Sequence, residues 1–474
     1  MAVRLMRAIV TVAAFLAAGC AAAPPYVRPQ VPVPTAYKEN QAAGGDQLQP
    51  ARPSDRVSRQ GWWGVFGDAH LNGLEGRLTS GNPTLAEAEA RVRQARALVQ
   101  KDRAEYFPIV TGNASAIRSR AGANSRAGTT TGTTLTDYAL GAGASWEPDL
   151  WGRIRANVAA GSASAQASAG DLENARLSLS SELAIDYFQS RSLDAELGLF
   201  DQTIEAYQRA ATLTRNQYDA GIVSRADVEQ ADTQLASAQA QAIDVRLQRT
   251  QLEHAIAVLI GEPPTAFSLV SLPLEGEPPA VPVDVPSRTL ERRPDVAAAE
   301  RRVAAANAQI GVASSAFFPS VTLGGSVGFQ ATRLQQWLSW PTAVWSVGPA
   351  LAMTLFDGGA RRAVKAQAVA DYDEMVGAYR QTVLSAFQDV EDNLAAERLL
   401  AEEAGRQAAA VAAANRSLEI SLNQYRAGLV SYLQVAIQQT AVLTNQRAAV
   451  SLTGRRFIAA VQLVRALGGG WDGD

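Results

Sequence analysis

The strongest constraint on the fold of this 474-residue chain is an internal repeat. The string NQYDAGIVS at 216–224 returns as NQYRAGLVS at 423–431, with seven of nine positions identical, and further matches lie upstream of both strings. Self-similarity of this kind indicates one structural unit that occurs twice. We therefore expect two copies of the same arrangement, at 81–260 and 291–467, joined by a Pro-rich linker at 261–290.

Each copy opens with an Ala-rich helical stretch of 27 residues, at 81–107 and 291–317. Pro108 and Pro319 end these stretches because proline cannot continue a helix. The segments that follow alternate apolar and small or polar side chains, which indicates strands. One β-hairpin per copy is therefore expected, with the turns falling at 122–136 and around 337–341.

Very long helices follow both hairpins. The stretches 152–217 and 359–424 run for 66 residues without proline, so each helix would span ~100 Å. A glycine reversal then leads into a 39-residue helical stretch with a 3.5-residue apolar seam, typical of coiled coils. Because the stretches of 39 and 27 residues together match 66 residues, one long helix can lie antiparallel to two shorter helices stacked end to end.

Two hairpins give four strands per chain, and membrane strands cannot leave their edges unpaired in lipid. Several chains must then share one barrel. Two, three or four chains would give 8, 12 or 16 strands, and a barrel of about eight strands is filled by side chains whereas larger barrels enclose a lumen. Strand counting therefore predicts an oligomeric pore and leaves a trimer and a tetramer open.

The N-terminus has the pattern of a secretory signal at 1–19, with Arg4 and Arg7 before an apolar run. The segment AAGC then resembles the lipobox of bacterial lipoproteins, which predicts that Cys20, the only cysteine, carries a covalent lipid. We expect 20–80 to form a lipidated N-terminal segment and equatorial region, and 468–474 a C-terminal tail. The formal net charge of −3 and the absence of a basic tract argue against nucleic acid as a partner.

The sequence gives little support for an enzyme or a metal site. It has two histidines, His70 and His254, four methionines and no glycine-rich phosphate loop or Gly-x-Ser-x-Gly motif. Acidic residues adjacent to the histidines in sequence do not by themselves make a shared site. We therefore predict no catalytic residue, no metal and no cofactor apart from the lipid on Cys20.

Several segments resemble the outer-membrane factors, the TolC-like channels, and in particular the lipoprotein branch that serves resistance-nodulation-division (RND) efflux pumps. The segments are GWWGVFGDAHLNGL at 61–74, RALGGGW at 465–471 and, most specifically, the block from ERRPDVAAAERR to SVTLGGSVG at 291–328. The resemblance implies a membrane α+β fold, in which a homotrimeric 12-stranded β-barrel is continuous with a long periplasmic α-helical coiled-coil barrel. It also implies an outer-membrane location, a periplasmic membrane-fusion adaptor and an inner-membrane RND-type pump.

The family's tunnel closes at its periplasmic tip and opens when the adaptor docks there. The resemblance assigns docking to residues of the two repeated tips: Tyr218, Gly221, Val223, Ser224, Gly428, Val430 and Ser431. It assigns the gate to Tyr218, Tyr425 and Arg426. Related proteins often place an aspartate where this chain has Ile437, so we expect the gate to use aromatic and apolar contacts, with an Asp219–Arg426 ion pair as an added link.

The resulting functional prediction is a passive outer-membrane exit duct for small molecules such as drugs or toxic compounds. Two alternatives remain from the sequence: a protein-secretion exit tunnel, and a structural coiled-coil lipoprotein of the outer membrane that does not conduct. The transported compound and the particular pump are not encoded in a duct that accepts what its pump delivers.

Overall fold

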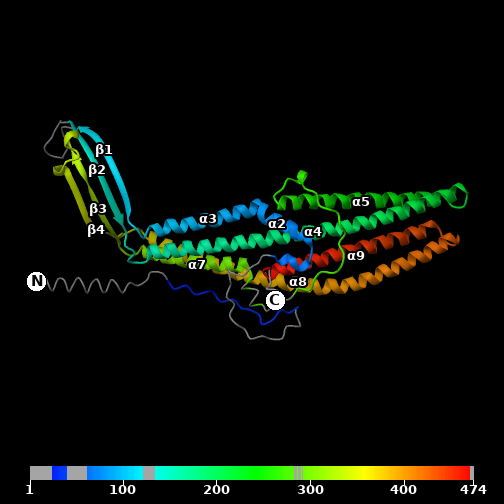
Figure 1. Cartoon of the computed structure of the whole chain (residues 1–474). Helices are drawn as coiled ribbons and strands as arrows, with labels where there is room; N and C mark the ends of the chain where they lie inside the picture. The colour runs from blue at the N-terminus through cyan, green and yellow to red at the C-terminus, as the bar shows by residue number, and fades with distance from the viewer. Residues whose placement is uncertain are drawn as a thin grey trace. The chain divides into compact units, whose positions relative to one another are not determined.

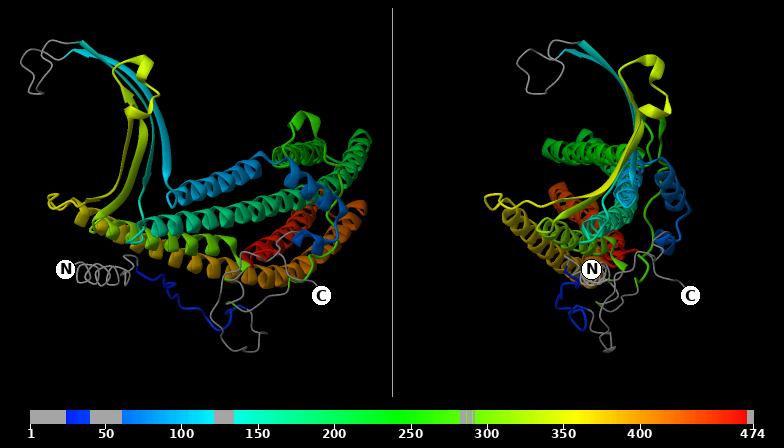
Figure 2. Two further views of the ribbon diagram at one scale, coloured as in Figure 1. Left: turned by 60° about the vertical axis from the view of Figure 1, so that its left-hand side comes forward. Right: turned by 90° about the vertical axis from the view of Figure 1, so that its left-hand side faces the viewer.

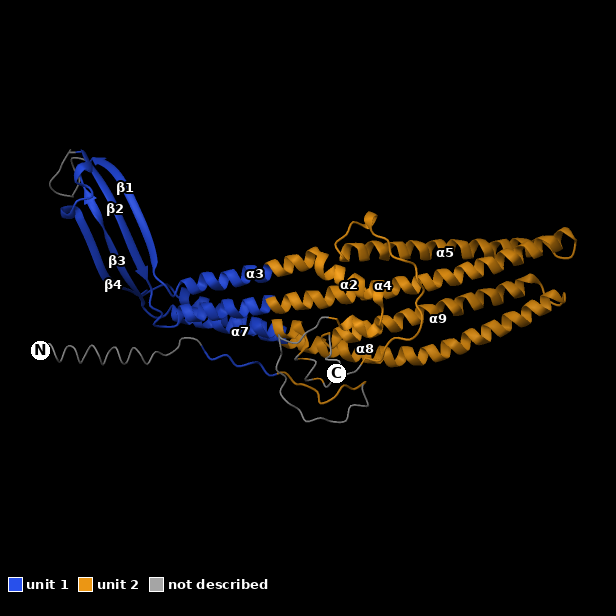
Figure 3. Cartoon of the chain, viewed as in Figure 1, with its two compact units in different colours: residues 1–30, 91–168, 299–379 blue, residues 31–90, 169–298, 380–474 orange. Residues whose placement is uncertain are grey.

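The computed structural model describes residues 24–39, 61–120, 134–281, 286, 290 and 292–469. Predicted features at 1–19, at Cys20 and in the turn at 122–133 lie outside these residues. The chain divides into two compact units, coloured separately in Figure 3. The first unit comprises 1–30, 91–168 and 299–379, and the second comprises 31–90, 169–298 and 380–474.

The first unit contains a four-stranded antiparallel sheet in the order β1-β2-β3-β4, and the sheet curves along its strands (Figure 2). Its strands are β1 (Ile109–Arg120), β2 (Thr134–Trp146), β3 (Ser320–Ala331) and β4 (Ala343–Ala352). Each predicted hairpin is therefore confirmed, and the two hairpins pair with one another through β2 and β3. β1 and β4 are the edges of this sheet and have one neighbouring strand each.

The pairing between the two hairpins depends on a close backbone approach. Gly141 of β2 lies opposite Gly328 of β3, and a Cβ atom added to Gly328 would lie 2.4 Å from the carbonyl oxygen of Leu140. Any larger residue at Gly328 would therefore push the strands apart. Glycine at this position lets the two copies of the repeat form one sheet.

The long helices agree closely with the sequence prediction. Figure 1 labels α3 (Pro83–Ala104), α4 (Arg153–Asp219), α7 (Pro294–Ser315) and α8 (Ala360–Arg426). The helices α4 and α8 each have 67 residues, against 66 expected. None of the helices in the described part of the chain is both long and apolar enough to cross a membrane.

In the second unit, α5 (Arg225–Leu259) ends where α3 begins, and α9 (Tyr432–Ala466) ends where α7 begins. The Asn82 side chain donates to the Leu259 carbonyl at 2.7 Å, and Arg293 donates to the Ala466 carbonyl at 3.2 Å. These bonds satisfy carbonyls that the last turn of a helix leaves without a partner. The predicted end-to-end stacking of the shorter helices is confirmed in both copies.

The helix α2 (Ala69–Gly81) and the short 3₁₀ helix η1 (Trp62–Phe66) before it were not predicted from the sequence. Asp68 caps α2, because its Oδ1 accepts hydrogen bonds from the backbone of His70 and Leu71. Glu75 of α2 is fully buried, and neither carboxyl oxygen has a hydrogen-bond partner in the described chain. Burial raises the pKa of Glu75 to about 8, so the neutral acid is the form that fits this core at pH 7.

Three further 3₁₀ helices complete the described elements: η2 (Pro264–Ala266), η3 (Leu334–Gln336) and η4 (Trp340–Thr342). The last two form the connection between β3 and β4, where the sequence predicted a turn around 337–341. The predicted start of α5 at 222 and of α9 at 429 was three residues early. The residues between are extended or in the glycine turn, so the helices begin only after Ser224 and Ser431.

Candidate functional site

The two helical hairpins of the second unit, α4–α5 and α8–α9, end in turns with the same backbone geometry. Gly221 and Gly428 both have φ of 73°, in the left-handed region that favours glycine. In the first turn the amide of Gly221 donates to the Tyr218 carbonyl at 2.8 Å and the amide of Ile222 donates to the Gln217 carbonyl at 2.8 Å. The second turn repeats both bonds at 2.9 Å, from Gly428 to Tyr425 and from Leu429 to Gln424. This pair of backbone hydrogen bonds closes the end of a helix around one left-handed residue.

The helices that leave the two turns are capped differently. Ser224 and Asp227 form a capping box at the start of α5, in which each side chain accepts from the backbone amide of the other. Ser431 makes no side-chain cap at the start of α9, and Gln434 stands where the first copy has Asp227. Instead, Asp227 Oδ1 accepts a hydrogen bond from the Tyr432 amide at 3.3 Å. One carboxylate of the first hairpin thus serves the first turn of both helices.

The duplicated tyrosines also lie in different environments. The side chain of Tyr218 is 42% exposed, whereas Tyr425 is only 9% exposed. The Tyr425 hydroxyl donates to Gln217 Oε1 at 2.7 Å, and its ring meets the ring of Tyr432 edge-on with centroids 5.6 Å apart. Burial raises the pKa of Tyr432 to about 12, so this ring stays neutral at physiological pH.

Small apolar side chains from both hairpins complete this contact. They pack around Tyr425 and Tyr432 as one buried cluster: Ala211 of α4, Ala231 of α5, and Val435 and Ala436 of α9. Together with the bonds from Gln217 and Asp227, this cluster joins the two hairpins near their turns. We call this set of contacts the tip latch.

The remaining predicted tip residues surround the latch. Val223 and Val430 are half-buried, while Ser224 and Ser431 are exposed. The large apolar side chains of Ile222 and Leu429 are exposed at the two turns. The structure therefore brings the predicted docking residues together at the ends of the hairpins, with apolar groups turned outward.

One predicted link does not form among the described residues of the single chain. Arg426 is exposed, and the ion pairs among the described residues do not include one between Asp219 and Arg426. Ile437, at the position of the missing aspartate, is exposed and does not join the buried cluster. The two hairpins are joined by hydrogen bonds and aromatic packing rather than by that charge pair.

Three hydrogen-bonding members of the latch were not predicted from the sequence, namely Gln217, Asp227 and Tyr432. The spacing Ser-x-x-Asp at 224–227 is a readable capping signal, but it does not reveal that the same carboxylate reaches a second helix. In the described chain there is also no group of three or more His, Cys, Asp or Glu side chains placed to hold a metal ion.

Comparison with known proteins fits this arrangement of duplicated hairpins and a four-stranded sheet. The family model described as outer membrane efflux protein matches residues 76–262 and 285–469, which is more than half of the chain. This chain belongs to the outer membrane efflux protein family. It is an efflux protein of the outer membrane, and the predicted family is confirmed.

Individual relatives cover nearly the whole chain. The outer membrane protein OprJ of Pseudomonas aeruginosa is 30% identical over 462 residues, spanning 96% of this chain and 93% of its own. The pyoverdine export outer membrane protein OpmQ of the same species is 30% identical over 426 residues, spanning 89% and 90%. The toluene efflux pump outer membrane protein TtgC of Pseudomonas putida is 29% identical over 463 residues, spanning 97% and 94%.

Solved structures confirm the fold class. The outer-membrane channel OprN matches with a TM-score of 0.87 and 31% identity, over 95% of this chain and all of that one. The MtrE outer membrane channel of Neisseria gonorrhoeae, solved in its open state, matches with a TM-score of 0.82 and 28% identity, over 95% and 98%. This efflux protein therefore has the predicted fold of a channel subunit, with four barrel strands and long helices in each chain.

Proposed function

We propose that this efflux protein is the homotrimeric exit duct of a tripartite pump. The observation that carries the proposal is the four-stranded sheet with an unpaired edge on β1 and another on β4. Pairing of β1 with β4 of a neighbouring chain would satisfy both edges, and three chains would give a 12-stranded barrel with a lumen. The long helices α4 and α8 would supply the wall of the periplasmic tunnel.

The duplicated tips are the proposed docking surface for a periplasmic membrane-fusion adaptor, which would connect the duct to an inner-membrane RND-type pump. Ile222 and Leu429 expose large apolar side chains at the two turns, and exposed apolar groups rimmed by polar ones are typical of protein interaction sites. Since the two turns share one backbone geometry, an adaptor with repeated hairpins could engage both in the same way.

The tip latch is the proposed gate element within each subunit. It joins α4–α5 to α8–α9 through the Tyr425–Gln217 and Tyr432–Asp227 bonds. Release of these contacts would let the hairpins separate and widen the tunnel end. Tyr218 and Arg426, which are exposed beside the latch, would then face the aperture.

We further propose that Cys20 carries the lipid that anchors the mature chain to the outer membrane, and that no cofactor takes part. The transported compounds would be small molecules of varied chemistry, because a passive duct does not select what its pump delivers. The relatives support this breadth, since one is a pyoverdine export outer membrane protein and another is the outer membrane protein of a toluene efflux pump. Mass spectrometry of the mature N-terminus tests the anchor, and an unmodified Cys20 or Ala21 terminus would reject it.

Planar-bilayer recording of the purified protein tests the duct. A pore gives stepwise conductance, whereas a structural lipoprotein gives none, and copurification of an RND-type pump with its adaptor separates efflux from protein secretion. Native mass spectrometry should find a trimer that survives detergent extraction. Deletion of residues 321–355, the second hairpin, should prevent barrel closure, and a stable monomer with four membrane strands would reject the shared barrel.

A further inference from the structure

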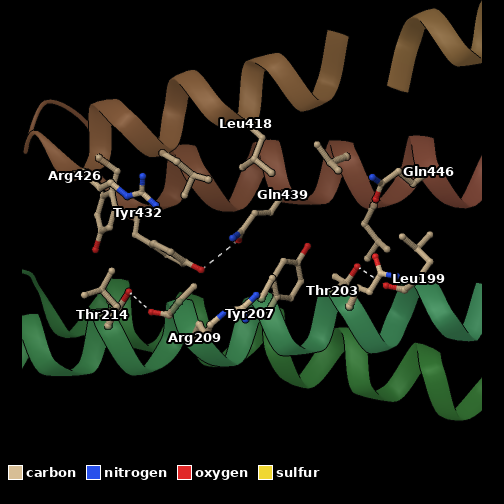
Figure 4. A pocket seen from close by; sticks show the side chains of 18 residues that line it. Leu199, Thr203, Tyr207, Arg209, Thr214, Leu418, Arg426, Tyr432, Gln439 and Gln446 are labelled. Atoms are coloured by element: carbon tan, nitrogen blue, oxygen red, sulfur yellow. Dashed lines mark hydrogen bonds between the residues drawn. The ribbon is translucent and has the colours of Figure 1, made fainter. Parts of the chain in front are cut away.

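The second unit contains a pocket of about 530 Å³ between α4 and the α8–α9 hairpin, beside the tip latch (Figure 4). Its volume is within the range of about 300–1,000 Å³ found for small-molecule sites. The residues of α4 that line it run from Leu199 to Thr214, so the pocket extends ~22 Å along the helix. An elongated molecule would fit this shape better than a compact one.

The walls of the pocket are largely apolar. Five leucines from three helices line it: Leu199, Leu213, Leu418, Leu422 and Leu443. Some of the polar groups in the walls are already paired within the chain. Thr203 and Thr214 donate back to carbonyls of their own helix, and the Tyr432 hydroxyl donates to Gln439 Oε1 at 3.2 Å, as Figure 4 shows.

Tyr207 differs from these groups. Its side chain is only 4% exposed, yet its hydroxyl has no hydrogen-bond partner in the described chain. Figure 4 shows this hydroxyl directed from α4 into the space between the helices. Buried hydroxyls are nearly always paired, and burial raises the pKa of Tyr207 to about 12, which keeps the hydroxyl protonated and able to donate.

The charged side chains that line the pocket are all positive. Arg209 and Arg426 line it, and none of the 18 described lining residues is acidic. Arg209 pairs with the exposed Glu205 at 2.8 Å outside the lining, while the described ion pairs give Arg426 no carboxylate. Arg426 lies at the end of the pocket nearest the turns (Figure 4). An anionic group there and an apolar body along the leucines would match the pocket.

We propose that this pocket is a binding site for an extended amphipathic carboxylate, whose single carboxylate would accept a hydrogen bond from Tyr207 and pair with the exposed side chain of Arg426. Such a ligand would contact α4 on one side and α8–α9 on the other. It would therefore add contacts between the two hairpins that the tip latch joins, and it would hold them together. The binding site does not depend on the proposed function, whereas the effect on opening rests on it.

Photo-crosslinking of the full-length protein in nanodiscs tests the site, with dodecanoate that carries a diazirine as the probe. We expect labelled peptides from 199–214 and 418–446, competed by unlabelled dodecanoate and not by dodecylammonium. The variant Ala206→Phe places a ring at an exposed alanine of the lining and should abolish this labelling. Ala236→Phe, on the exposed face of α5 outside the pocket, is the matched control and should label like the unmodified protein.

Two substitutions separate the polar contacts without changing the core. Tyr207→Phe should weaken competition by dodecanoate about tenfold, because it removes one hydrogen-bond donor to a charged group. Arg426→Gln should weaken it about tenfold, while Arg406→Gln, an exposed arginine elsewhere on α8, should have no effect. Labelling spread evenly along the helices, equal competition by the ammonium compound, or unchanged competition in both pocket variants would overturn the proposal.

Single-channel recording addresses the effect on opening separately. Dodecanoate should lower the open probability of the unmodified protein, and Tyr207→Phe should shift the required concentration upward by the same factor as in crosslinking. If dodecanoate labels this site but leaves the open probability unchanged, the binding site stands and the effect on opening is rejected. If the unmodified protein shows no conductance at all, the proposed duct is rejected, and the crosslinking result is unaffected.

Discussion

The two tip turns share seven of nine residues and one backbone geometry, yet they make different contacts. The first turn leaves Tyr218 exposed and caps its own helix with Ser224 and Asp227. The second turn buries Tyr425 and has no side-chain cap of its own. The backbone amide of Tyr432, the first residue of α9, instead donates to the Asp227 carboxylate of the first hairpin.

This difference shows how a duplicated unit can become complementary to its own copy. The first hairpin supplies hydrogen-bond acceptors, Gln217 and Asp227, and the second supplies donors and aromatic rings, Tyr425 and Tyr432. The glycine turn is common to both because its left-handed geometry depends on the backbone alone. The flanking side chains have diverged, so that each subunit can join its own two hairpins.

The largest expected effect comes from truncation of the two tyrosines. Tyr425→Ala should destabilise the tip region by about 3 kcal/mol, because it removes a buried ring and leaves Gln217 without this partner. Tyr218→Ala should cost no more than about 0.5 kcal/mol, since the side chain is largely exposed. Hydrogen–deuterium exchange of the first turns of α9 measures both.

The same variants test the gate. Tyr425→Ala should raise the open probability in planar bilayers without adaptor, and Tyr218→Ala should leave it close to that of the unmodified protein. Equal exchange rates and equal conductance for the two variants would mean that the difference in burial has no consequence for the gate. In that case the constriction lies away from the tip latch.

Substitution of either turn glycine should have the same effect, because the two turns share one backbone geometry. Gly221→Val and Gly428→Val should each cost about 1–2 kcal/mol, because a β-branched residue is strained at a φ of 73°. Apart from the glycine and its chain neighbours, no atom of the described residues lies within 4 Å of a Cβ added at either position, so backbone strain is the main local cost. Both variants should weaken adaptor binding in surface plasmon resonance to a similar degree, and a loss confined to one tip would reject equivalent docking.

The features of the fold that could be predicted are those that leave a local pattern in the sequence. The long helices and the hairpins were predictable because a missing proline and a two-residue alternation act locally. The helix α2 was missed although Asp68 caps it, because it has only 13 residues and lies outside the repeat from which the other helices were predicted. The end-to-end stacking followed from lengths alone.

The candidate site was only partly predictable. The repeated strings located Gly221 and Gly428, whose role depends on the backbone. They could not show that Tyr425 is buried and Tyr218 exposed, because burial depends on packing between hairpins about 200 residues apart in sequence. The predicted Asp219–Arg426 pair does not form in the described chain for the same reason, since charge complementarity in sequence does not fix which side chains meet.

A smaller effect is expected from the caps. Asp227→Ala should destabilise both tips by about 1 kcal/mol, because α5 loses its capping box and the Tyr432 amide loses its acceptor. The reverse change, Gln434→Asp, should gain a few tenths to about 1 kcal/mol by giving α9 a capping box of its own with Ser431. Exchange protection of the amides at the start of α5 and α9 measures each change, and an effect of Asp227→Ala on α5 alone would rule out the shared cap.

The smallest effect is expected from Arg426→Gln. Arg426 is exposed and the described structure pairs it with no carboxylate, and even a formed surface ion pair contributes only ~0 to 1 kcal/mol. Loss of the charge should therefore leave tip exchange rates and open probability unchanged when no carboxylate is added. A double-mutant cycle with Asp219→Asn isolates the pair, because subtraction of the single variants removes what each residue does alone. A coupling energy near zero that does not vary with salt would show that the Asp219–Arg426 pair does not help to join the hairpins. A coupling above about 0.5 kcal/mol that falls with added salt would show that the charge pair forms in the assembled duct, and the second tip would then contribute a charged link as well as an aromatic one.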